Sequence, residues 1–115
     1  MILPNIDNAI VPERKIVHYL LSRSHPRGQF KAAFFVEFGF SADKWRGLAD
    51  ALKQHAREHE VAMVEETPFG IRYTIDGPLA VPDGRKPNVR VGWFIRNGET
   101  APVLATAFPL PRAKA

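Results

Sequence analysis

The chain has 115 residues, of which 45% are hydrophobic, and this is typical of one globular domain with a single core. It contains no cysteine, which excludes disulfide frameworks, thiolate zinc sites and cysteine nucleophiles and is compatible with a reducing compartment. The net charge of +4 is modest. No apolar stretch is long enough to span a bilayer and no signal-peptide pattern opens the chain, so we expect a cytoplasmic protein without a membrane partner.

The first half of the chain predicts helices after an extended start. A short helix is expected from Pro12 to about Ser22, because apolar residues recur there at helical spacing. The segment Phe30 to Phe38 is ambiguous: its alternation fits a strand, whereas its paired alanines and the following Gly39 permit a helix, which we favour. The clearest helix has a plausible N-cap at Ser41 and runs to about His59. Its apolar stripe consists of Trp45, Leu48, Ala49, Leu52 and Ala56.

After Glu60 the hydrophobic period changes from helical to two, which predicts β-strands. Four strands are expected, at about residues 61–66, 71–76, 89–96 and 103–108. Turns are predicted between them, including a strong hairpin signal at Asn97-Gly98. In the third strand one face is predicted to carry Val89, Val91, Trp93 and Ile95, and the other Arg90, Gly92, Phe94 and Arg96.

These elements predict the fold class α+β, with N-terminal helices packed on one face of a four-stranded antiparallel β-meander. Neither layer is stable alone, because the apolar stripe of the helices and the apolar face of the sheet must cover each other. We expect a single domain over residues 1–115, with extended tails at about residues 1–11 and 110–115. The opposite face of the sheet is predicted to be open to solvent.

The open face is a candidate RNA-binding surface. It presents Arg90 and Arg96 with Phe94 between them, and Arg72 and Thr74 from the neighbouring strand. Guanidinium groups around an aromatic ring suit single-stranded RNA. Basic residues also gather between Arg14 and Lys31 and from Arg85 onward. If these two regions meet in space, they form a basic face suited to phosphate. The alternatives are a patch that binds a protein partner, a single exposed phenylalanine, or a solvated charged surface.

The loop His25-Pro-Arg-Gly28, followed by Lys31, is the most specific motif. With this motif the sequence resembles a family of uncharacterised bacterial and phage domains of about this length. The other matching segments are Leu3-Pro-Asn5, Val89-Arg90, Trp93-Phe-Ile95 with Gly98, and Thr106 to Pro109. The order of helices followed by a four-stranded meander also resembles the barnase, EndoU and RelE superfamily of metal-independent ribonuclease toxins, an architectural analogy.

The second resemblance implies RNA cleavage by attack of the 2′-OH, which needs a base, an acid and cations that hold charge on phosphorus. Under it, His25 serves as acid or base, Arg27 and Lys31 bind the phosphate, Arg90 reaches in from the sheet, and Thr106 donates a hydrogen bond. Structural roles remain open for each group. His25 before a proline can simply fix a turn, the strand alternation makes Thr106 a buried filler, and Arg90 can pair with an acid on the sheet.

No cofactor or metal is predicted. His55 and His59 have the spacing of a two-histidine metal pair, but no HExxH pattern accompanies them, and both are interpreted as exposed helix residues. Two other function classes fit the sequence. One is an antitoxin or immunity protein that uses the exposed basic face to bind its partner, and the other is a domain that binds nucleic acid without cutting it.

Overall fold

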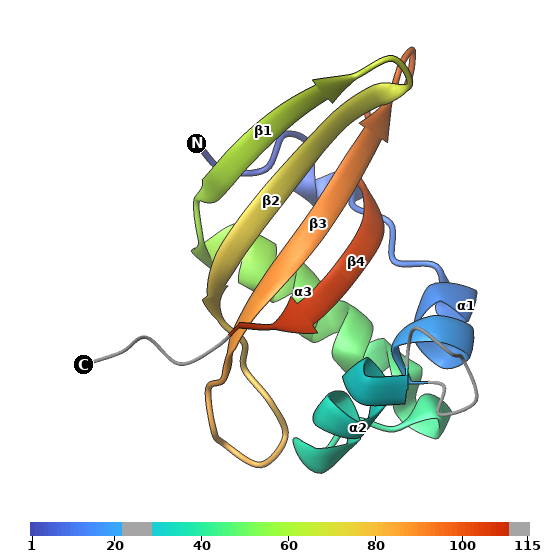
Figure 1. Ribbon diagram of the computed structural model, residues 1–115, viewed down its shortest axis with the longest axis vertical. Helices are drawn as coiled ribbons and strands as arrows, with labels where there is room; N and C mark the ends of the chain where they lie inside the picture. The colour runs from blue at the N-terminus through green and yellow to red at the C-terminus, as the bar shows by residue number, and fades with distance from the viewer. Residues whose placement is uncertain (22–28, 111–115) are drawn as a thin grey trace.

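Figure 1 shows a computed structural model of the chain, in which helices lie behind an antiparallel sheet. The structure describes residues 1–21 and 29–110, without the side chains of residues 18, 19 and 29–31. Helices come first and strands after, so the predicted α+β class and its layer order are confirmed. In this view none of the helices in the described residues lies over the side of the sheet turned to the reader, and we call this side the open face.

The helical layer contains one long helix and several short ones. The elements in chain order are η1 (Ile6–Asn8), α1 (Glu13–Lys15), η2 (Ile16–Leu20), α2 (Gln29–Glu37), η3 (Ala42–Lys44) and α3 (Trp45–Glu58). The choice of a helix for the ambiguous phenylalanine-rich segment is therefore confirmed by α2. The expected stripe of α3 is also present, because Leu48, Leu52 and Ala56 are buried against the sheet.

The sheet is a meander of four strands in the order β1-β2-β3-β4. The strands are β1 (Val61–Thr67), β2 (Gly70–Pro78), β3 (Asn88–Arg96) and β4 (Val103–Pro109). Each pairs antiparallel with the next, and β2 and β3 stay in register over their full length. This even alternation places Val89, Val91 and Trp93 in the core, as the sequence predicts.

The first eleven residues, expected as an extended tail, pack against the domain. Leu3, Ala9 and Val11 are buried, and the Ile10 backbone forms a short parallel bridge to Val103 at the start of β4. The Ile10 amide donates to Pro102 O, and the Leu104 amide donates to Ile10 O. This segment therefore protects part of the β4 edge from water.

A bulge in β4 changes which residues reach the open face. Gly92 lies opposite Thr106, whereas the next residue, Trp93, lies opposite Leu104, so Ala105 is an extra residue in the strand. Leu104 consequently points into the core, while Thr106 is partly exposed opposite Gly92. The interpretation of Thr106 as a buried filler beside Leu104 is thus wrong, because one inserted residue reverses the alternation.

Candidate functional site

A basic hollow lies where the open face meets helix α1. It has a volume of about 600 Å³ and is lined by Arg14, Lys15, Arg72, Phe94, Arg96, Glu99 and residues 103–105. Helix α1 supplies the first two cations, and β2 and β3 supply the two arginines. The two basic regions of the sequence therefore do meet in space, here at Arg14, Lys15 and Arg96.

Three of the four cations of this hollow, Arg14, Arg72 and Arg96, are available to a ligand. Arg14, Arg72 and Arg96 form no ion pair with any other residue that the structure describes. The lining contains four cationic side chains, one carboxylate, Glu99, and the partly exposed side chain of Phe94. Guanidinium groups bind phosphate oxygens through paired donors, and an aromatic ring stacks with a base. The hollow thus has the groups that hold an anionic nucleotide.

A smaller central hollow of about 190 Å³ continues along the open face. Its lining is Met63, Glu65, Arg72, Thr74, Arg90, Gly92, Thr106 and Phe108. Arg72 borders both hollows, so they are neighbours on the sheet. Thr106 and Arg90, both predicted as site residues, therefore lie at one place on this face.

Arg90 has a structural partner. Its Nε and Nη2 donate hydrogen bonds of 2.8 Å each to the two carboxylate oxygens of Asp76, which lies directly opposite on β2. The hydrogen bond from Arg90 lowers the pKa of Asp76 below its ordinary value. This geometry favours the alternative in which Arg90 pairs with an acid, so Arg90 has fewer unpaired donors than Arg72 or Arg96.

The predicted loop residues are only partly placed. His25 and Arg27 lie outside the described residues. The backbone of Lys31 belongs to the first turns of α2, and its position is one helical turn before Phe34. Whether the imidazole and these cations converge on one site stays a prediction.

Two cations of the basic hollow, Arg14 and Lys15, are missing from the predicted phosphate-binding set, and Arg72 is predicted on the open face without being assigned to that set. The run of basic residues from Arg14 to Lys31 was a signal for the first two, but only the packing of α1 beside the sheet brings them to Arg96. Arg72 follows from strand alternation, which puts it on the same face as Phe94, its partner across β2 and β3.

The model of the family described as "Domain of unknown function (DUF6883)" matches residues 2–111 of the chain. The chain belongs to this family. This DUF6883 chain is similar to a chain in a solved structure titled "Contact-dependent growth inhibition toxin - immunity protein complex from Klebsiella pneumoniae 342". The two chains share 15% sequence identity and superpose with a TM-score of 0.73. The match covers 93% of this chain and 97% of the other, and at this identity it shows a shared fold. No curated protein matches.

The two helical histidines of this DUF6883 chain have a structural role. His55 is 2% exposed, so its interpretation as an exposed residue is wrong, and His59 is half-buried. Nε2 of His55 donates to Gly77 O at 3.1 Å, and Nε2 of His59 donates to Pro78 O at 3.0 Å. The pair thus ties α3 to the end of β2. Within residues 1–21 and 29–110 no cluster of three or more His, Asp or Glu side chains is arranged to hold a metal ion.

None of the helices in the described parts of this DUF6883 chain combines the length and the hydropathy that crossing a membrane requires.

Proposed function

We propose that this chain is a metal-independent endoribonuclease of the toxin type, which binds RNA on the open face of its sheet. The observation that carries the proposal is the basic hollow, which Arg14, Arg72, Arg96 and Phe94 line together. A phosphate between these guanidinium groups would leave the neighbouring base free to stack on the ring. The chain shares its fold with a chain of a toxin and immunity protein complex, and this supports the proposal that it is a toxin.

The proposed chemistry is transesterification. The 2′-OH attacks the adjacent phosphorus, a base accepts its proton, and an acid protonates the departing 5′-oxygen, which leaves a 2′,3′-cyclic phosphate. His25 would act as acid or base, because an imidazole titrates near neutral pH. Lys31 and Arg27 would hold the charge that develops on phosphorus, and Thr106 would donate a hydrogen bond from the central hollow.

RNA cleavage in EDTA tests the proposal. Wild-type protein should cut single-stranded RNA and leave 2′,3′-cyclic phosphate ends, whereas His25→Ala and Lys31→Ala should cut at least about 100-fold more slowly, as expected for a lost acid or base. Arg96→Glu should raise KM more than it lowers kcat, because it removes a binding cation. The matched control is Arg57→Glu on α3, whose side chain lies 3.7 Å from Asp7 and lines neither hollow. Unchanged cleavage in both His25→Ala and Lys31→Ala would overturn the site assignment.

A second candidate function is a non-catalytic module that binds a protein partner, as an immunity protein or antitoxin does. It is favoured by Phe69, which is 77% exposed at the tip of the β1–β2 hairpin although its backbone is held firmly. The Phe69 amide donates to Oγ1 of Thr67 at 3.2 Å, and its carbonyl accepts from the Asn97 amide at 3.0 Å. An exposed aromatic residue on a backbone that is already fixed loses less entropy on binding, which is typical of interface anchors. A folded wild-type protein that cleaves no RNA would favour this candidate.

A further inference from the structure

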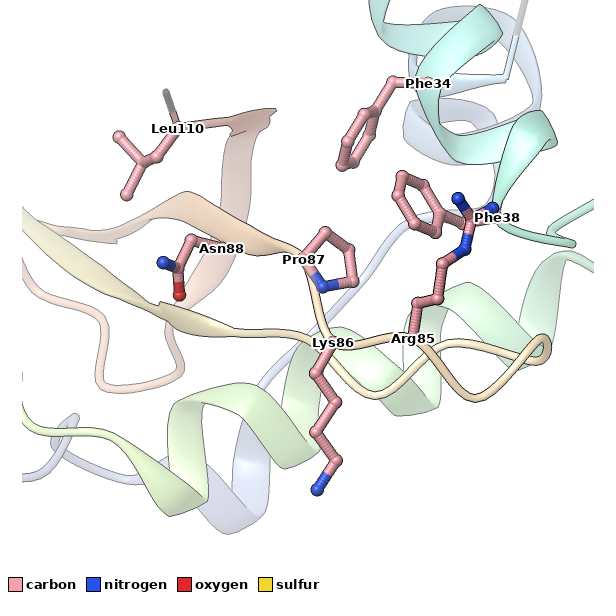
Figure 2. Close-up of a pocket in the computed structure, with 7 residues that line it drawn as sticks. All are labelled: Phe34, Phe38, Arg85, Lys86, Pro87, Asn88 and Leu110. Atoms are coloured by element: carbon pink, nitrogen blue, oxygen red, sulfur yellow. The ribbon is translucent and has the colours of Figure 1, made fainter. Parts of the chain in front are cut away.

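A third hollow, which we call the aromatic pocket, lies between helix α2 and the ends of strands β3 and β4. It has a volume of about 490 Å³ and is lined by Phe34, Phe38, Arg85, Lys86, Pro87, Asn88 and Leu110. Figure 2 shows the two phenylalanine rings on the side of α2, with Pro87 and Asn88 across from them. The pocket therefore joins aromatic surface, an amide and two basic residues at one end of the sheet.

Strand β3 connects the aromatic pocket to the basic and central hollows, so that the three form a row along this strand. Along β3, alternation puts Asn88, Arg90, Gly92, Phe94 and Arg96 on the same side. Arg96 and Phe94 border the basic hollow, Gly92 and Arg90 the central hollow, and Asn88 the aromatic pocket. On β4, Phe108 borders the central hollow, and Leu110, whose amide donates to Asn88 O at 3.0 Å, borders the aromatic pocket.

This row has the length of a short RNA strand. From Asn88 to Arg96 the strand rises by about 27 Å, at about 3.4 Å per residue. A few extended nucleotides cover such a distance, which is comparable to the site of one small single-strand-binding domain.

We propose that the aromatic pocket takes an unpaired base of single-stranded RNA whose backbone follows β3 from the basic hollow across the open face. This inference rests on the proposed function, since it specifies the substrate as single-stranded and adds a second anchoring point to the basic hollow.

The side chains of the pocket match a nucleobase in both shape and chemistry. Arg85 already occupies one side of Phe38, with its guanidinium carbon 4.1 Å from the ring centroid, and it is held there by a hydrogen bond of 2.7 Å to Asp83. Phe34 lies 4.8 Å from Phe38 between ring centroids and borders the pocket, so it is the ring on which a base would stack.

Polar recognition would come from Asn88 and Lys86. The Asn88 side-chain amide forms no hydrogen bond with another described residue, and an amide can both donate to and accept from a base edge. Lys86 is exposed and extends away from the rings in Figure 2, at the rim where a flanking phosphate would pass. A paired base presents neither a free face nor a free edge, so the pocket selects single strands.

Binding of 2′-O-methyl RNA tests this inference, because these oligonucleotides lack the attacking hydroxyl and are not cut by transesterification. We would measure Kd for a six-nucleotide single strand and for the blunt duplex of the same sequence. Two variants are compared with wild type: Phe34→Leu, which keeps an apolar side chain, and Asn88→Ala, which changes an exposed residue. Each should weaken binding of the single strand, Phe34→Leu by about tenfold. Neither should change binding of the duplex. The matched control is Phe69→Leu, the same substitution at a ring outside the three hollows. Thermal unfolding should show that all three variants are folded.

The outcomes separate the two proposals. If Arg96→Glu weakens binding but Phe34→Leu and Asn88→Ala bind the single strand like wild type, the aromatic pocket is not an RNA subsite and the proposed function stands. An equal loss for single strand and duplex in Phe34→Leu would also overturn the subsite. If the wild type binds neither oligonucleotide, the proposed function fails and this inference fails with it.

Discussion

Arg90 and Asp76 face each other across strands β3 and β2 and are joined by two hydrogen bonds of 2.8 Å. Both side chains are partly exposed, at 39% and 29%. The pair therefore adds little to stability, but the negative charge of Asp76 offsets the positive charge of Arg90 on the face where RNA is proposed to bind.

Removing that negative charge should strengthen RNA binding. Asp76→Asn keeps the shape of the side chain and is expected to lower Kd for single-stranded RNA about threefold, since a unit charge about 6 Å away in water is worth ~0.7 kcal/mol. The free energy of unfolding should fall by about 0.5 kcal/mol. Filter binding at low salt and urea unfolding measure the two effects. The control is Asp50→Asn on the exposed side of α3, and weaker binding by Asp76→Asn would contradict the open-face site.

Strand alternation predicted the open face well because β2 and β3 pair without interruption. The positions of Arg90, Phe94 and Arg96 follow from period two alone, and nothing in the structure disturbs it. The same rule failed in β4, where Ala105 is an extra residue. The position of a bulge depends on the pairing partner as well as on the bulged strand. The local sequence of β4 therefore could not predict that Thr106 reaches the open face.

The basic hollow and the buried histidine needed tertiary information. Arg14 and Arg96 are distant in sequence, and only the packing of α1 beside the sheet brings them together. His55 lies at the border of the apolar stripe of α3. Its Nε2 donates to Gly77 O, and Gly77 also leaves room for the neighbouring ring of His59; neither feature is visible within the helix.

The pH dependence of stability should reveal His55. Burial lowers its pKa from 6.5 to about 4, since the surroundings disfavour the charged ring. Below pH 6.5 the unfolded chain binds a proton that the folded chain does not, so the free energy of unfolding falls as the pH falls from about 6.5 towards 4. The full effect is about 3 kcal/mol. His55→Leu should be nearly flat between pH 4.5 and 6.5 in urea unfolding, while His59→Leu should keep the slope. A wild-type slope retained in His55→Leu would contradict the assignment.

The hairpin that presents Phe69 should depend on a glycine. Gly70 has φ +155°, and a Cβ atom there would lie 2.2 Å from Ile95 O, which is backbone and cannot move aside easily. Gly70→Ala should therefore lower the free energy of unfolding by about 3 kcal/mol. Gly47→Ala is the matched control, because Gly47 is inside α3 with nothing within 4 Å of the new atom, and alanine should stabilise it by ~0.5 to 1 kcal/mol. Equal changes in the free energy of unfolding in the two variants would show that the turn does not require glycine at position 70.

The cations of the basic hollow should be countable from the salt dependence of RNA binding. Each phosphate contact on a single strand contributes about −0.7 to the slope of log K against log salt concentration, because binding releases condensed counterions. Arg72→Ala and Arg96→Ala should each reduce the size of the slope by about 0.7, and the double variant by about twice that amount. Arg57→Ala on α3 is the control, since Arg57 lines neither the basic nor the central hollow. Because the slope counts ionic contacts and does not report total affinity, it separates a phosphate ligand from a residue that only supports the fold. A slope unchanged in Arg96→Ala at reduced affinity would mean that Arg96 positions the loop after β3 and does not touch RNA.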